Sequence, residues 1–230
     1  MSQPVLVAYG MGVDSTAMLI GMHQRGERPD AILFADVGSE KPDTYAYLPV
    51  IQAWLARVGF PQVEVVRYVP KKAKNVDSLE GDCLNNGTLP SLAFGWKTCS
   101  LKWKVGPQNK WTNHWEPAIQ AWGRGERVQR LIGYDAGGRD SKRCTYAGKF
   151  DDDPKYENRY PLQEWGWDRE RCEAEIAAAG LPVPVKSACF FCPASKPWEI
   201  AQIVDRHPEL ADRIIEMERN AAPKLIQIDG

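Results

Sequence analysis

Two glycines, an aspartate and a serine follow a short apolar run near the amino terminus, in the stretch AYGMGVDSTAML (residues 8–19). Glycine allows the backbone to approach an anion closely, and the free amides at the start of a helix favour negative charge. The stretch lacks the lysine of the common nucleotide loop and the G-x-G-x-x-G spacing of a dinucleotide fold. These residues by themselves fit a phosphate-binding loop or an ordinary tight turn.

A second group of reactive side chains is the cysteines, of which only Cys189 and Cys192 form a tight C-x-x-C pair. Thiolates at this spacing suit zinc or an iron–sulfur cluster, and a redox dithiol is the rival interpretation. Pro193 and the aromatic residues between the two cysteines would shield a cluster from water, which slightly favours iron–sulfur. The other cysteines are at positions 83, 99, 144 and 172.

The elements that position these groups alternate between short apolar runs and segments of helical periodicity. Strands are predicted at 4–9, 31–36, 62–69 and 127–135, and helices at 15–24, 41–59, 108–122, 168–180, 197–206 and 208–221. Residues 136–159 are predicted to be a long polar loop with the role of a lid. The pattern predicts an α/β fold, an open parallel sheet with helices on both faces, followed by a helical C-terminal extension that carries a metal site. The expected domains are 1–165 and 166–230.

Composition excludes only a few classes of protein. The 29 basic and 30 acidic residues give a formal net charge of -1, so bulk charge argues neither for nor against a nucleic-acid partner. No run approaches 18 apolar residues and no basic region precedes the first apolar run, so we expect no membrane span, no signal peptide and a cytoplasmic location.

Four ordered motifs between residue 5 and about residue 200 resemble those of one family. Gly12, Val13, Asp14 and Ser15 fit the pyrophosphate loop S-G-G-x-D-S, with Gly10 and Met11 replacing its first two residues. FADVGSEKPDTYAYL (34–48) is similar to F-x-D-T-G-x-x-x-P-E-T, and KTCSLKWKVGP (97–107) to C-C-x-x-R-K-x-x-P, with Ser100 replacing the second cysteine. IGYDAGGRDSKR (132–143) is the fourth. The chain thus resembles the phosphoadenosine phosphosulfate reductase-like family of the PP-loop ATP pyrophosphatase (adenine nucleotide alpha hydrolase) superfamily.

The resemblance implies an adenine-nucleotide site that binds ATP with Mg²⁺. The implied nucleotide-binding residues are Tyr9, Gly10, Met11, Gly12, Val13, Asp14, Ser15, Asp36, Gly133 and Arg143. The implied catalytic residues are Asp14, Lys104 and Arg139.

The resemblance also implies a [4Fe-4S] cluster, with zinc as the alternative. Its expected ligands are Cys83, Cys99, Cys189 and Cys192. The fourth ligand is open, because Cys172, Cys144 or an external group at an open iron are alternatives to Cys83.

The activity expected from the resemblance is an ATP-dependent, adenylating and pyrophosphate-releasing sulfurtransferase that acts on a nucleic acid or nucleotide and receives sulfur from a donor protein. One alternative is a phosphoadenosine or adenosine phosphosulfate reductase, although the E-C-G-x-H tail of those enzymes is missing. The other is a nucleotide-binding protein with a structural metal site. The oligomeric state is open, with a homodimer as one option. Tryptophans near Lys102 and Lys104 (Trp96, Trp103 and Trp111) are expected to pack in the core rather than to stack on bases.

Overall fold

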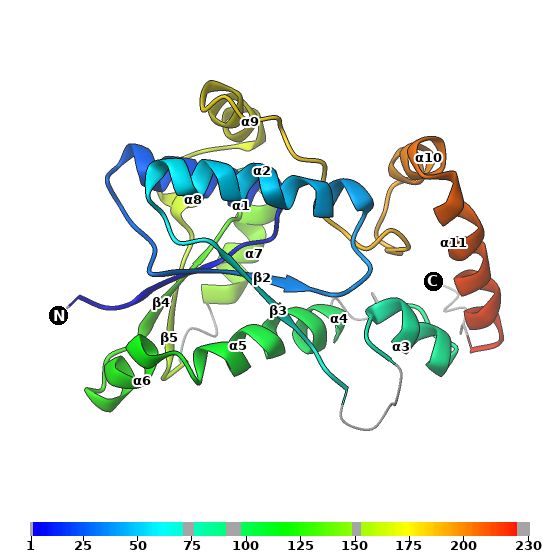
Figure 1. Cartoon of the computed structure of the whole chain (residues 1–230), viewed down its shortest axis with the longest axis horizontal. Helices are drawn as coiled ribbons and strands as arrows, with labels where there is room; N and C mark the ends of the chain where they lie inside the picture. Colours follow the sequence, from blue (N-terminus) through cyan, green and yellow to red (C-terminus); the bar gives the residue numbers. More distant parts are fainter. Residues whose placement is uncertain (1, 71–75, 91–97, 149–152, 225–230) are drawn as a thin grey trace. The chain divides into compact units, whose positions relative to one another are not determined.

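The computed structural model describes residues 2–70, 76–90, 98–148 and 153–224. Its centre is a five-stranded parallel sheet of order β3-β2-β1-β4-β5 (Figure 1). The strands are β1 (Val5–Ala8), β2 (Ala31–Asp36), β3 (Val63–Arg67), β4 (Val128–Ile132) and β5 (Tyr156–Arg159). Leu6 of β1 is in register with Ala31 of β2 and with Arg130 of β4. The strand order therefore reverses on either side of β1, and ligands of open sheets bind at such a point.

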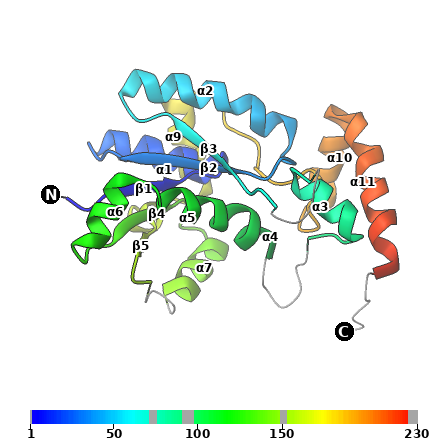
Figure 2. The same cartoon turned by 60° about the horizontal axis from the view of Figure 1, so that its bottom comes forward.

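The helices that accompany the sheet are α1 (Val13–Gln24), α2 (Pro42–Val58), α5 (Gly106–Thr112), α6 (Glu116–Gly123), α7 (Gly138–Gly148), α8 (Pro161–Glu164) and α9 (Arg169–Ala178). Helices α1 and α2 lie on one face of the sheet and α6 on the other, as Figures 1 and 2 both show. Helix α9 packs against α1. The predicted fold class, an open parallel sheet covered on both faces, is confirmed.

The remaining elements are α3 (Leu79–Asn86), α4 (Thr98–Ser100), the π-helix η2 (Leu101–Val105), α10 (Pro197–Arg206), α11 (Pro208–Ala221) and the 3₁₀ turn η3 (Ala222–Lys224). The two closing helices have the bounds that the sequence predicted. Among the residues described, no helix is both long enough and apolar enough to cross a membrane.

The predicted lid at 136–159 is wrong in part, because it contains α7 and β5. Most residues of α7 are polar, and they lie on one side of the helix. Such a helix needs only a narrow apolar stripe, so its sequence reads as a polar loop. Strand β5 pairs with β4 at the edge of the sheet, where Val128 is in register with Tyr156.

Two compact units make up the chain, and each combines distant segments. The sheet unit comprises 1–34, 42–66 and 108–187, and the cysteine unit comprises 35–41, 67–107 and 188–230. Each has its own buried core: Leu19, Ile32 and Leu131 belong to the first, and Trp103 and Phe190 to the second. The division into domains at residue 165 stays a prediction.

Candidate functional site

The glycine-containing loop joins β1 to α1 in the sheet unit. Gly12 is the N-cap of α1, and no side chain caps the helix there. The Ser15 hydroxyl accepts a hydrogen bond from the Gly10 amide and donates one to the Gly12 carbonyl, both at 3.2 Å. The first amides of a helix have no partner within it, and the helix dipole favours an anion at this end. The loop has the geometry of an anion site.

Met11 adopts a left-handed conformation with φ of 56°, and its side chain is fully buried. A non-glycine residue is uncommon there, whereas glycine enters this region freely. The pyrophosphate-loop motif that this sequence resembles has glycine at this place, so Met11 has the left-handed backbone conformation without being a glycine.

Two other residues predicted to bind the nucleotide contribute buried side chains. Tyr9 is buried, and its hydroxyl lies 3.0 Å from Thr16 Oγ1. Burial raises the pKa of the Tyr9 hydroxyl, so it stays neutral. Val13 is also buried. Any contact of either residue with a nucleotide stays a prediction.

Gly133, at the end of β4, lies against the loop. A Cβ atom at this glycine would be 2.8 Å from both the amide nitrogen and the Cα atom of Ser15. Such distances are too short for non-bonded carbon, so only glycine allows this approach. The predicted residue Gly133 therefore belongs to the loop's immediate surroundings.

Three carboxylates gather beside the loop. Asp14, Asp135 and Asp140 each offer an oxygen, and these oxygens lie within 4.8 Å of one another. Carboxylate oxygens are the ligands that Mg²⁺ prefers. Only Asp14 was among the predicted site residues, although Asp135 is the last residue of the strand predicted at 127–135, where site residues of parallel sheets gather.

Arg169, the first residue of α9, faces the same carboxylates. Its Nη2 atom lies 3.1 Å from Asp14 Oδ2, and its Nε atom lies 3.6 Å from Asp135 Oδ2. Sequence reasoning missed Arg169, because 155 residues separate it from Asp14 and nothing in the local pattern of α9 indicates the contact.

The pKa of the Asp14 carboxyl is higher than the usual value of an aspartate. Burial raises its pKa to about 6, the cation of Arg169 opposes this, and Asp135 and Asp140 add to the rise. Shifted acids of this kind cluster at functional sites.

Helix α7 carries both arginines that were predicted to belong to the site, Arg139 and Arg143. The Arg143 Nη1 atom lies 2.9 Å from Asp140 Oδ1, so this side chain contacts the carboxylate cluster. The side chain of Arg139 lies outside the described residues, as does Trp96. Nucleotide binding by Arg143 and a catalytic role of Arg139 stay predictions.

Asp36, at the end of β2, lies in the cysteine unit. Its carboxylate accepts a hydrogen bond from the Gly38 amide at 2.8 Å and forms an ion pair with Arg67. It caps the turn that follows β2, and its predicted contact with the nucleotide stays a prediction.

All four predicted metal ligands belong to the cysteine unit. Cys83, Cys99 and Cys189 border one apolar cluster that contains Trp103, and Cys99 interacts electrostatically with both Cys83 and Cys189. Cys192 closes a turn in which its amide donates to the Cys189 carbonyl at 3.1 Å.

The two alternative ligands, Cys144 and Cys172, belong to the sheet unit. Cys172 is fully buried in the apolar core of that unit, and Cys144 lies on α7. Of the three candidates for the fourth ligand, Cys83 alone shares a core with Cys99 and Cys189.

The segment that follows β2 holds the C-x-x-C loop through its backbone. The Phe190 amide donates to the Ser39 carbonyl at 3.1 Å, and the Lys41 amide donates to the Ala188 carbonyl at 3.3 Å. Glu40 forms an antiparallel bridge with Cys189. The second motif of the sequence therefore supports the cysteine segment.

Lys104 is held by an acid in the same unit. Its Nζ atom lies 2.8 Å from Glu40 Oε1, and the Glu40 side chain is fully buried. Burial would lower the pKa of Lys104, but the carboxylate and its hydrogen bond raise the pKa above the usual value, so Lys104 stays charged. Its predicted catalytic role stays a prediction.

The donor set fits a soft metal centre. Burial raises the pKa of Cys83 to about 11, and burial also raises that of Cys189, so both are neutral thiols until a metal displaces their protons. Among the residues described, no three cysteine sulfurs lie within 4.8 Å of one another.

The fold and these groups define a class: an α/β protein with an anion-binding loop beside three carboxylates, and a separate unit with four cysteines. No family profile matches the chain, and no curated protein matches its sequence. Among solved structures, the chain is similar to the U34-tRNA thiolase NcsA from Methanococcus maripaludis with its [4Fe-4S] cluster, with a TM-score of 0.49 and 13% identity over 100% of this chain and 74% of that chain.

Proposed function

We propose that this chain is an ATP-dependent enzyme that releases pyrophosphate and transfers sulfur to a nucleic acid or nucleotide. The observation that carries the proposal is the β1–α1 loop, with its uncapped helix start, adjoining the carboxylate cluster and closed on one side by Gly133. Backbone amides there would receive the charge of the leaving pyrophosphate.

In the reaction, a carbonyl or phosphate oxygen of the acceptor attacks the α-phosphorus of ATP. The bond from that phosphorus to the bridging oxygen breaks, pyrophosphate leaves, and the acceptor carries AMP. Sulfur from a donor protein then displaces AMP. Asp14, Asp135 and Asp140 would hold Mg²⁺, which neutralises charge on the leaving group. Arg169 would keep Asp14 and Asp135 together until the cation binds.

Cys83, Cys99, Cys189 and Cys192 would hold an iron–sulfur cluster, with each thiolate as the ligand of one iron. The apolar core that Cys83, Cys99 and Cys189 border would limit the access of water to the cluster. The charge of Lys104 beside Cys189 and Cys99 would offset that of the thiolates.

Pyrophosphate release tests the proposal. Protein reconstituted anaerobically with iron and sulfide is expected to release pyrophosphate from ATP with Mg²⁺ when mixed tRNA, DNA or nucleotides are present. Asp14→Asn is expected to lower the rate by at least about a hundredfold, because it removes a cation ligand. A broad absorption band near about 400 nm would distinguish an iron–sulfur cluster from zinc.

Two results would replace the proposal. Sulfite release from a sulfonucleotide would indicate a reductase. ATP binding without cleavage in the presence of every acceptor would indicate a nucleotide-binding protein with a structural metal site.

A further inference from the structure

Cys83 is carried by a helix that is too short to be stable by itself. Helix α3 has eight residues, and isolated helices need about 12–15 residues to be even marginally stable. Ser78 is its N-cap residue, and Ser78 Oγ accepts a hydrogen bond from the Gly81 amide at 3.1 Å. Gly87 ends the helix in a left-handed conformation. At this end of α3 the Leu84 and Cys83 carbonyls accept hydrogen bonds from the Gly87 and Thr88 amides, and the helix end also takes further partners from outside this segment.

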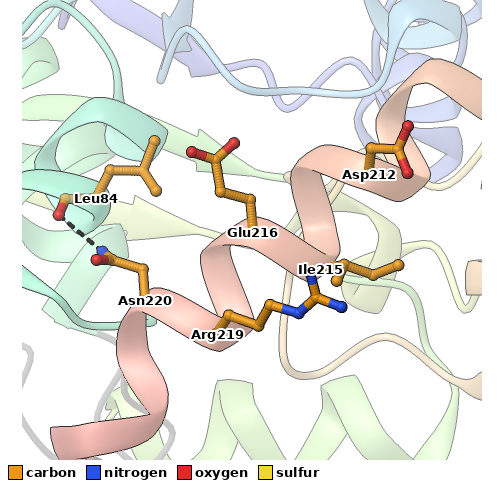
Figure 3. A pocket seen from close by; sticks show the side chains of 6 residues that line it. All are labelled: Leu84, Asp212, Ile215, Glu216, Arg219 and Asn220. Atoms are coloured by element: carbon orange, nitrogen blue, oxygen red, sulfur yellow. Dashed lines mark hydrogen bonds between the residues drawn. The ribbon is translucent and has the colours of Figure 1, made fainter.

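The C-terminal segment supplies these partners. Asn220 Nδ2 donates to the Leu84 carbonyl at 2.8 Å, the bond drawn in Figure 3. Lys224 Nζ donates to the Asn86 carbonyl at 2.6 Å. The positive charge of Lys224 also suits the negative end of the α3 dipole. Helices α3 and α11 flank a groove lined by Leu84, Asp212, Ile215, Glu216, Arg219 and Asn220 (Figure 3).

Arg213 of α11 contacts both segments that carry cysteines. Its guanidinium forms a two-pronged ion pair with Glu80 of α3, with Nε 2.9 Å from Oε1. Such a fork fixes geometry as well as charge. The Cζ atom of the same guanidinium lies 4.7 Å from the centroid of the Phe190 ring, within the C-x-x-C loop.

Two stripes of α11 contact the part of the cysteine unit that contains Cys83. Arg213 and Asn220 are seven residues apart and lie on one stripe of the helix, which faces α3. Leu210, Ile214 and Met217 are buried in the core that also contains Cys83 and Phe190. The helix thus packs against this core and ties together the segments around it.

We propose that α11 braces Cys83 as the fourth ligand of the cysteine centre, and that Arg213 is the positioning residue of this brace. The inference deepens the proposed function and rests on it for the identity of the cluster, whereas the placement of Cys83 can be tested without metal.

The first test measures alkylation of Cys83 by iodoacetamide in metal-free protein, followed by peptide mass spectrometry. Arg213→Met keeps the length of the side chain but removes the ion pair, and is expected to speed alkylation of Cys83 about tenfold through local opening of α3. Arg213→Lys, which keeps the charge without the fork, is expected to be intermediate. Cys172, fully buried in the other unit, should react at the wild-type rate.

Arg124→Met is the matched control, because Arg124 also forms an ion pair, with Glu126 in the sheet unit. It should leave the alkylation of Cys83 unchanged. If Arg213→Met does not yield folded protein, Glu80→Gln weakens the same fork from its partner and is measured instead. An unchanged rate at Cys83, or an equal rise at Cys172, would overturn the proposal.

The second test uses reconstituted protein. After brief exposure to dioxygen as the oxidant, Arg213→Met is expected to show the electron paramagnetic resonance signal of a three-iron cluster and less iron per chain, as Cys83→Ala should. A wild-type-like spectrum for Arg213→Met would overturn the brace. If wild-type protein bound no iron, the cluster assignment would fail, and the alkylation rates would still decide the role of Arg213.

Discussion

Gly133 leaves no space for a side chain beside the β1–α1 loop, so a single methyl group there is expected to be costly. Gly133→Ala places Cβ against the Ser15 backbone. We expect a loss of about 1–3 kcal/mol in the free energy of unfolding, because the backbone must shift, together with weaker ATP binding. Gly138→Ala is the control, since a Cβ there meets nothing within 4 Å. Chemical denaturation and ATP titration measure both effects, and equal behaviour of the two variants would contradict the assignment.

At Asp14 the fold favours the protonated acid, which gives stability a defined dependence on pH. Its pKa rises from 3.8 to about 6, so the native state binds more protons than the unfolded chain between these values. The free energy of unfolding should therefore fall as pH rises through this window, by up to about 3 kcal/mol. Asp14→Asn should remove that fall and be the more stable protein above pH 6. Denaturation at pH 4–7 without divalent cations tests this, and parallel curves would refute it.

At the scale of elements, η2 shows why tryptophans near lysines need not bind bases. Trp103 is 1% exposed, packs in the core of the cysteine unit and lies 4.9 Å from Tyr68 between ring centroids. The expectation that it packs in the core is confirmed. The π-helical turn carries Trp103 inward while Leu101, two residues earlier, stays 52% exposed.

Two substitutions within η2 separate burial from exposure. Trp103→Ala is expected to cost about 3–5 kcal/mol, because it empties a large buried site. Leu101→Ala should change stability by no more than about 0.5 kcal/mol. Thermal and chemical denaturation give both values. A small effect of Trp103→Ala would mean that this side chain is not part of the core.

At the scale of the whole molecule, the anion loop and the cysteines belong to different units, so their ligands should stabilise different parts of the chain. Removing the cluster with a chelator is expected to increase amide hydrogen exchange in α3, α11 and residues 188–192 and to leave β1 and β4 unchanged. Mg²⁺ with ATP should instead protect residues 10–16 and 133–140. Hydrogen-exchange mass spectrometry measures both, and an equal loss of protection in both units on chelation would contradict the prediction.

The sequence by itself determined most strands of the sheet and the two closing helices, because their signals are local. The apolar run AILFAD predicted β2 to the residue, and Asp168 marked the start of α9, where it accepts a hydrogen bond from the Arg171 amide. The glycine loop and the C-x-x-C pair were likewise recognisable from spacing, whereas Cys99 was indicated only by the resemblance of its segment to a family motif. The helix α7 was missed, since its sequence is so polar that few apolar residues mark the buried side of a helix.

Tertiary structure alone decided which distant residues meet. It set Arg169 and Asp135 beside Asp14, placed Gly133 against Ser15, and put Cys83 rather than Cys172 in the core of Cys99 and Cys189. These contacts depend on strand order and on the packing of helices far apart in the chain. Local propensity contains no information about such pairings, because they arise only when the cores of the two units form.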